Sequence, residues 1–419
     1  MAPLTDPTAL RNLVRREVDS LPILDIHTHI YSPRFGRLLL WGLDELLTYH
    51  YLVAEVFRVA PMPYEQFWAM SKREQADHIW KHLFLDRSPV SEACRGVLTV
   101  LQRLGLDVGK RDLAAARKYF ESIPVEDYLD KVFEVANVRG VIMTNDPFDD
   151  LESPVWMRGR EDDQRFGAAL RIDPLLNAWQ TAAPRLTDWG YATRGDLGPS
   201  DIDAVKRFLF DWIERIRPRY MAVSMPNTFV YPDVGPTTTL IEKCVLPVAK
   251  QANIPFALMI GVRRQVNPGL RLAGDGVGRA AMESIYDLCV RFPENRFLVT
   301  MLSRENQHEL CIAARKYSNL HVFGCWWFLN DPSIIEEMTR ERLELLGLSF
   351  TPQHSDARVL DQLIYKWAHS RAIIGDILCD KYADLLQTGW APTEAEIRRD
   401  VAALFGGEFE RFCGIAKQR

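Results

Sequence analysis

Short apolar runs alternate with longer amphipathic segments along most of the chain, and this alternation constrains the fold most strongly. Such alternation is typical of βαβ units and a parallel sheet. An opening run ends at His27 and His29, and a helix is expected over about 238–252. The other expected strands lie at residues 138–145, 168–172, 220–224, 254–260, 296–302, 320–327 and 348–353.

Eight strands in a chain of 419 residues predict an α/β fold, a (β/α)8 TIM-type barrel. A doubly wound open sheet fits the same strand count. Residues from about 36 to 135 carry apolar side chains at helical spacing and no strand signal, so we expect a helical insertion after strand one. We interpret residues 1–419 as a single domain, with helices also at its C-terminal end.

The composition favours a small-molecule substrate. With 47% hydrophobic and 26% charged residues, a net charge of -5 and a pI near 6.0, the chain has no footprint for nucleic acid or an anionic membrane. No apolar run reaches membrane-spanning length, and the N-terminus has no signal-peptide pattern. The seven cysteines show no paired spacing, which indicates a reducing compartment. We therefore expect a cytoplasmic protein, and a barrel of this kind commonly forms homo-oligomers.

Polar residues gather at the expected strand ends, where a barrel builds its active site. His27 and His29 are one residue apart, so strand alternation turns both to the same face. A lone His-x-His often has a structural explanation, but Asp356 stands after the last strand. Two imidazoles and a carboxylate suit a borderline metal such as zinc, with one position left open. The chain has no GxGxxG, P-loop or GxSxG motif, so no nucleotide or organic cofactor is expected.

Several stretches stand in the order seen in one enzyme family. From about residue 23 to 380 these stretches are His27-Thr-His29 with Ser32-Pro33, His50-Tyr51, Thr144-Asn-Asp-Pro147, Arg171-Ile-Asp-Pro174, Met259-Ile-Gly-Val-Arg-Arg264, Phe323-Gly-Cys-Trp-Trp-Phe328 and Ser355-Asp-Ala-Arg358. In these motifs the chain resembles the amidohydrolase superfamily and, more closely, its uronate isomerases.

The resemblance implies an aldose–ketose isomerase that acts on a hexuronate. Its reaction would be D-glucuronate to D-fructuronate, D-galacturonate to D-tagaturonate, or both, by metal-assisted proton transfer through a cis-enediol. It also implies one divalent metal, best fitted by zinc, on His27, His29 and Asp356. Asp356 would be the base and Arg358 the group that stabilises the enediolate.

Further residues are expected around a sugar acid. A permanent carboxylate calls for a planar guanidinium, so Arg171 and Arg264 are candidates to bind it. His50 and Tyr51 match a family pair near the sugar and are candidate catalytic residues. Trp327 could stack on the sugar or wall the pocket. Each of these residues also has an ordinary structural explanation as a core contact or an ion pair.

Two positions depart from the family pattern. Met259 stands where a histidine is usual, and it can neither bind zinc well nor relay protons. His354 stands two residues before Asp356, where an apolar residue is expected. We hypothesise that His354 compensates for Met259, by orienting Asp356 or relaying a proton; a buried, satisfied histidine is the other interpretation. The segment 220–226 ends without a lysine, which favours one metal over a lysine-bridged pair.

Two other functions fit parts of the sequence. One is a metal-dependent hydrolase or decarboxylase of a small carboxylic acid on the same barrel. The other is a non-catalytic binding protein with a degenerate site, against which the intact His27, His29, Asp356 and Arg358 argue. The product separates the enzymes, because an isomerase releases neither carbon dioxide nor a hydrolysis fragment.

Overall fold

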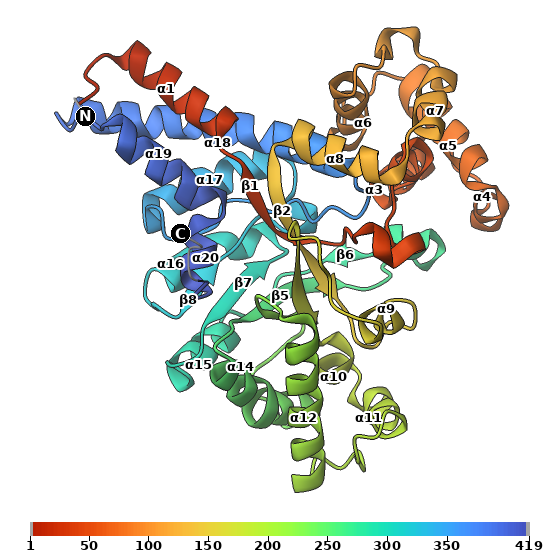
Figure 1. The fold of residues 1–419 in the computed structure, drawn as a ribbon, viewed down its shortest axis with the longest axis vertical. Helices are drawn as coiled ribbons and strands as arrows, with labels where there is room; N and C mark the ends of the chain where they lie inside the picture. Colours follow the sequence, from red (N-terminus) through yellow and green to blue (C-terminus); the bar gives the residue numbers. More distant parts are fainter. Residues whose placement is uncertain (1–2, 416–419) are drawn as a thin grey trace.

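The structure, a computed structural model, describes residues 3–415. Its centre is one sheet in which seven parallel strands follow one another in chain order (Figure 1). The chain order and the parallel pairing confirm the (β/α)8 TIM-type barrel. The strands are β1 (Ile23–Thr28), β2 (Val138–Asn145), β3 (Phe166–Arg171), β4 (Met221–Pro226), β5 (Phe256–Arg263), β7 (Phe297–Met301) and β8 (Leu320–Val322).

Helices cover the outside of the sheet. The first is α1 (Pro7–Ser20). Those between later strands are α9 (Ser153–Met157), α10 (Asp173–Asn177), α11 (Trp179–Asp188), α12 (Pro199–Ile216), α13 (Pro236–Leu240), α14 (Leu246–Ala252), α15 (Glu283–Arg291) and α16 (Gln307–Ala314), and α17 (Pro332–Leu346) follows β8. The chain closes with α18 (Gln362–Gln387), α19 (Glu394–Ala402) and α20 (Glu408–Phe412). Among the described residues, no helix is both long and apolar enough to cross a membrane.

The expected insertion forms a group of helices between β1 and β2 (Figure 1). Asp361, just before α18, ties it to the barrel, since its carboxylate accepts from the Tyr128 hydroxyl at 2.5 Å and from the Gly42 N–H at 2.8 Å. Gly96 lets α6 approach α18, because a Cβ there would lie 2.8 Å from the Tyr365 ring. The helices are α2 (Leu43–Leu47), α3 (His50–Val59), α4 (Tyr64–Ala69), α5 (Lys72–Trp80), α6 (Glu92–Arg103), α7 (Leu113–Ser122) and α8 (Val125–Ala136).

Strands are present at the first seven expected positions, with two differences from the expected pattern. β8 ends at Val322 instead of 327, because the backbone turns at Gly324 with a φ of +70°. A two-residue strand, β6 (Gly276–Val277), pairs antiparallel with β5 and was not expected. The predicted helix over 238–252 is present as α13 and α14, joined through a π-helical turn at Ile241–Val245.

The expected eighth strand at 348–353 is not a regular strand, and only Thr351 makes a β-bridge, to Phe323. Pro352 has no N–H to donate, and Asp356 has a φ of +50°, so the segment cannot continue an extended ladder. It still occupies the eighth position. Thr351 donates to the Val322 carbonyl at 3.0 Å, and Asp356 donates to the His27 carbonyl at 3.1 Å. The segment thus joins β8 to β1 and closes the barrel.

A buried carboxylate, Asp25 on β1, stabilises the seam, by which we mean the junction between β1 and the closing segment. Asp25 accepts the Ser355 N–H at 3.1 Å and the indole N–H of Trp367 at 2.8 Å. Burial raises the pKa of Asp25, and hydrogen bonds from Ser355 and Trp367 act against that rise. One side chain on β1 therefore fixes both the last barrel segment and the helix α18 that covers it.

We predict that Asp25→Ala weakens the fold at this seam. The change leaves two buried N–H donors without acceptors, which costs about 2–4 kcal/mol in the free energy of unfolding. Urea denaturation measures this loss, and Asp19→Ala, at an exposed position before β1, serves as the control. Equal stability of the Asp25→Ala protein and the wild type would show that the seam does not depend on this carboxylate.

Candidate active site

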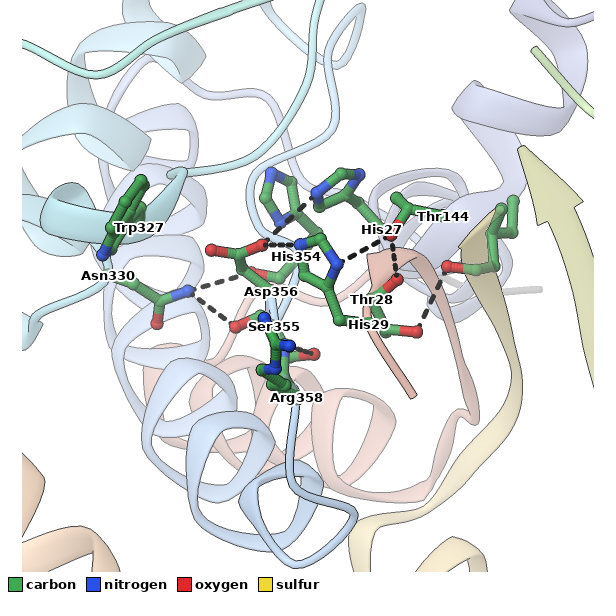
Figure 2. Close-up of polar contacts among 12 residues, drawn as sticks. His27, Thr28, His29, Thr144, Trp327, Asn330, His354, Ser355, Asp356 and Arg358 are labelled. Atoms are coloured by element: carbon green, nitrogen blue, oxygen red, sulfur yellow. Dashed lines mark hydrogen bonds and ion pairs between the residues drawn. The ribbon is translucent and has the colours of Figure 1, made fainter. Parts of the chain in front are cut away.

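Three side chains converge where β1 meets the closing segment. The Nε2 atoms of His27 and His29 lie 3.3 and 3.5 Å from Oδ1 of Asp356 (Figure 2). His27 and Asp356 are buried, and His29 is partly exposed. One ligand atom from each of the three residues lies within 4.8 Å of the other two, the one such group of three or more in residues 3–415.

The tautomer of His27 follows from its neighbour Tyr220. The Tyr220 hydroxyl donates its proton to the Ile26 carbonyl at 2.8 Å, and it lies 3.3 Å from Nδ1 of His27. Since a hydroxyl has one proton, it accepts from Nδ1–H of His27. The Nε2 atom of a neutral His27 is therefore unprotonated, and its lone pair faces Asp356.

His29 is held in the same way by Thr144. The Thr144 hydroxyl donates to the Thr28 carbonyl at 3.1 Å and lies 2.8 Å from Nδ1 of His29, from which it accepts (Figure 2). Burial lowers the pKa of His29 to about 4, although Asp356 acts in the opposite direction. His29 is thus neutral at pH 7, and its Nε2 lone pair also faces Asp356.

Three lone pairs therefore meet without a proton between them. Burial would raise the pKa of Asp356, but hydrogen bonding and positive charge at His27 and His29 hold it well below its ordinary value, so the carboxylate is charged. A metal ion bound between these atoms would supply the same positive charge in place of protons. Neither His27 Nε2 nor Asp356 Oδ1 has a hydrogen-bond donor, although both are buried. Two imidazoles and a carboxylate, with a phenol and a hydroxyl that orient the imidazoles, are a ligand set that fits a divalent metal ion.

The backbone at Asp356 is in the left-handed region, with a φ of +50°. An aspartate tolerates this conformation better than most residues, but it still requires support from its surroundings. Asn330 donates to the carbonyls of both His354 and Ser355 at 3.1 Å. The turn directs Oδ1 to the histidines, while the second carboxylate oxygen points away from them (Figure 2).

A cavity of about 220 Å³ opens in front of this group. Its size and polar walls suit a small polar molecule. Eight of the residues expected from the sequence line it: His27, His29, His50, Arg171, Arg264, Trp327, Asp356 and Arg358. Met259 also lines it, so a thioether occupies the position where the family pattern has a histidine.

The two arginines expected at a substrate carboxylate are both paired with an aspartate. Arg171 makes a two-pronged contact to Asp173, with both bonds at 2.9 Å. Burial would lower the pKa of Arg171, but Asp173 raises it above its usual value, so the guanidinium stays charged. Arg264 is more exposed and contacts Asp275 at 2.6 Å. The cavity thus contains two oriented guanidinium groups.

The two candidate residues on α3, His50 and Tyr51, lie in different positions relative to the cavity. His50 lines the cavity, and burial lowers its pKa to about 3, so the imidazole is neutral. Tyr51 is not among the cavity-lining residues, and its hydroxyl lies 3.4 Å from the Trp327 carbonyl. Trp327 lines the cavity and has a φ of +47°. Tyr51 therefore contacts the segment that holds the indole.

His354 does not line the cavity. Its ring is fully buried, 4.9 Å from the ring of His27, and neither ring nitrogen has a hydrogen-bond partner. Burial lowers the pKa of His354 well below its ordinary value. Gly324 makes room for it, because a Cβ there would lie 2.0 Å from the imidazole. The ring packs against His27 and Phe323.

Sequence reasoning missed other parts of the site. Tyr49, Ser224, Leu272 and Asp275 line the cavity, and Tyr220 orients His27 from inside the barrel. Tyr49 directly precedes the His50-Tyr51 pair, so its place beside this motif could have identified it as a cavity residue. Leu272 and Asp275 belong to the loop after β5 and carry no local motif. Only the path of that loop brings them over the cavity.

Comparison with known proteins gives matches among solved structures. No family model matches the chain, and no curated protein matches it. A glucuronate isomerase from Caulobacter crescentus has a TM-score of 0.74 and 16% identity over 99% of this chain and 95% of that chain. A uronate isomerase from Thermotoga maritima has a TM-score of 0.76 and 16% identity over 96% and 97%. At this identity these two structures show the fold alone.

A third structure is far more similar in sequence. A uronate isomerase from Bacillus halodurans C-125 has a TM-score of 0.96 and 58% identity, and the match covers 98% of this chain and 97% of that chain. Identity at this level over nearly the whole of both chains decides the family. The chain belongs to the uronate isomerases of the amidohydrolase superfamily and is an isomerase.

Proposed function

We propose that this protein interconverts a hexuronate and its keto acid, D-glucuronate with D-fructuronate, D-galacturonate with D-tagaturonate, or both. The observation that carries the proposal is the meeting of three lone pairs, from His27, His29 and Asp356, at the wall of a small cavity that also contains guanidinium groups. The similarity to a uronate isomerase over nearly the whole chain supports the same reaction.

We propose zinc as the ion that His27, His29 and Asp356 hold. Two imidazole nitrogens and one carboxylate oxygen suit zinc and leave a coordination position for a substrate oxygen or water. When bound, such an ion would polarise the oxygens of the sugar and lower the barrier to enolisation.

Asp356 would be the base that transfers the proton between C2 and C1. Its Oδ1 faces the histidines, so the second carboxylate oxygen is the one available to the substrate. In the open-chain sugar this oxygen would take the proton from C2, and the electron pair of that bond would form the C1–C2 double bond of a cis-enediol. The electron pair of the C1 carbonyl would move to O1. Transfer of a proton from O2 to O1, and return of the proton from Asp356 to C1, would then leave a hydroxyl group on C1 and a ketone at C2. Arg358 lines the same cavity and stays charged, so it would stabilise the negative charge on the enediolate oxygens.

The remaining cavity residues would bind the substrate. Arg171 would hold the substrate carboxylate, because its guanidinium is fixed by Asp173 and still lines the cavity. Arg264, at the cavity's exposed edge, would be a second contact to this group. Trp327 would form the part of the cavity wall that contacts the sugar. The neutral His50 would bond to its hydroxyls, while Tyr51 would act through the Trp327 carbonyl. His354 would support His27.

A hydrolase or decarboxylase remains the second interpretation of the sequence, but no observation at the site favours it. The similar structures described above are named as isomerases. The two functions differ in their products, so the assay for isomerisation also tests this alternative.

We further propose that residues 1–419 form one domain that works as a homo-oligomer in the cytoplasm. The contact of Asp361 with Tyr128 and Gly42 supports one domain, because it joins the helical insertion to α18. The seven cysteines support a reducing compartment, since all are buried and none forms a disulfide.

We expect Asp356→Asn to abolish isomerisation. The amide keeps the shape of the carboxylate but is not a base, so kcat should fall by a factor of about 100 to 10,000. Proton NMR of glucuronate and galacturonate mixtures follows the keto acid directly, and Asp19→Asn is the control at an exposed aspartate. Near-normal turnover by the Asp356→Asn protein would rule out this base. Release of carbon dioxide by the wild type would favour the second function.

Arg171→Lys should weaken substrate binding more than the chemical step. Lysine keeps the charge but loses the two-pronged geometry, so KM should rise about tenfold while kcat changes less. Arg165→Lys is a matched control, because Arg165 also pairs with an aspartate two residues away, Asp163, yet does not line the cavity. An unchanged KM for Arg171→Lys would contradict a carboxylate-binding role.

Removal of the metal should remove activity. We expect prolonged dialysis against a chelator to leave a folded, inactive protein, and about one equivalent of zinc to restore turnover. Elemental analysis and circular dichroism give the metal content and the fold. His27→Ala should neither retain the metal nor recover on zinc addition. Full activity in a protein shown to contain no metal would contradict the proposed centre.

A further inference from the structure

The helix α18 carries polar side chains on the face that meets the closing segment of the barrel. Gln362, in its first turn, accepts the N–H groups of Arg358 at 2.9 Å and Val359 at 3.0 Å. One turn later, Lys366 donates to the Ser355 carbonyl at 2.5 Å. These contacts lie on either side of Asp356. One helix face therefore fixes the backbone before and after the proposed base.

Lys366 is an unusual residue at such a place. Its side chain is only 3% exposed, and burying an ammonium group is costly unless it is compensated. Burial lowers the pKa of Lys366 to about 8, against the effect of the carboxylates of Asp356, Asp25 and Glu92. The ammonium also lies 5.7 Å from the centre of the Tyr51 ring. A methionine would fill a similar volume without this cost, so packing alone does not account for a lysine here.

The hydrogen bonds explain what the amine contributes. The Ser355 peptide is held at both ends, its N–H by Asp25 and its carbonyl by Lys366 and Asn330. The next residue, Asp356, has the left-handed φ of +50°. A strained conformation persists where several contacts fix the neighbouring atoms. The Ser355 carbonyl belongs to the peptide unit that ends at the Asp356 N–H, which donates to the His27 carbonyl. Contacts to both groups therefore fix the backbone from which the Asp356 side chain extends.

We propose that Lys366 is a positioning residue of the isomerase: its ammonium group fixes the Ser355 carbonyl and so directs the Asp356 carboxylate onto His27 and His29. The effect on catalysis rests on the function proposed above, whereas the effect on metal binding does not. Lys366 does not line the cavity, and it donates its hydrogen bond to a backbone carbonyl and not to a proposed metal ligand. Its effect on the site therefore passes through the backbone.

The test compares Lys366→Met with the wild type in metal affinity and in steady-state kinetics. Because loss of a group that orients a ligand weakens metal binding or activity by about 10-fold to 100-fold, we expect the zinc dissociation constant to rise and kcat to fall by such factors. KM should change less than about threefold, since the substrate contacts remain. Lys381→Met, at a partly exposed position farther along the same helix where the amine pairs with Glu344, should match the wild type.

An unchanged zinc affinity and kcat in a folded Lys366→Met protein would overturn the proposal. If that variant does not fold, Asn330→Ala tests the same carbonyl from another segment, and it should weaken zinc binding and lower kcat in the same direction. Wild-type values in a folded Asn330→Ala protein would also overturn it. Should the wild type turn over no uronate, the proposed function fails, while the zinc titration still decides the role of Lys366.

Discussion

The site depends on one electrostatic arrangement, in which the Nε2 atoms of two imidazoles point at a charged carboxylate oxygen. His27 and His29 face Asp356 at 3.3 and 3.5 Å, and their other ring nitrogens are already engaged by Tyr220 and Thr144. Such an arrangement is repulsive unless a cation lies between the atoms. The Nε2 atom of His27 and the Oδ1 atom of Asp356 are buried and have no hydrogen-bond donor, which is the strongest indication of a metal site in the structure.

Closure of the barrel creates this arrangement, since the ligands come from its first and last segments. Asp356 donates to the His27 carbonyl, and the His29 N–H donates to the Ala357 carbonyl at 2.7 Å, so backbone pairing brings the two ligand groups together. Asp25 and the start of α18 hold the closing segment from behind. Stability at the seam and geometry at the site are thus linked through the same hydrogen bonds.

The sequence predicted the barrel and most of the cavity because both depend on local patterns. Apolar runs mark strands, and polar residues at strand ends fall on one rim, which is how Arg171 and Arg358 could be named in advance. The segment at 348–353 was wrongly predicted as a regular strand, since hydropathy does not register the missing donor of Pro352 or the left-handed turn at Asp356.

Contacts between distant segments could not be predicted from the sequence. Asp275 reaches the cavity only through the path of its loop, and Lys366 has the hydropathy of an exposed residue although it is buried beside the site. Tyr51 was expected near the sugar, and His354 was expected to orient Asp356 or relay a proton. In the structure Tyr51 contacts the Trp327 carbonyl, and the His354 ring lies against the ring of His27. Motifs identify which residues matter; packing decides through which neighbour they act.

Anomalous diffraction from crystals grown with zinc tests the central claim most directly. The account predicts one strong peak about 2.0–2.2 Å from Nε2 of His27, Nε2 of His29 and Oδ1 of Asp356. Crystals that show no anomalous peak there, with the histidine nitrogens hydrogen-bonded directly to the Asp356 carboxylate, would contradict it.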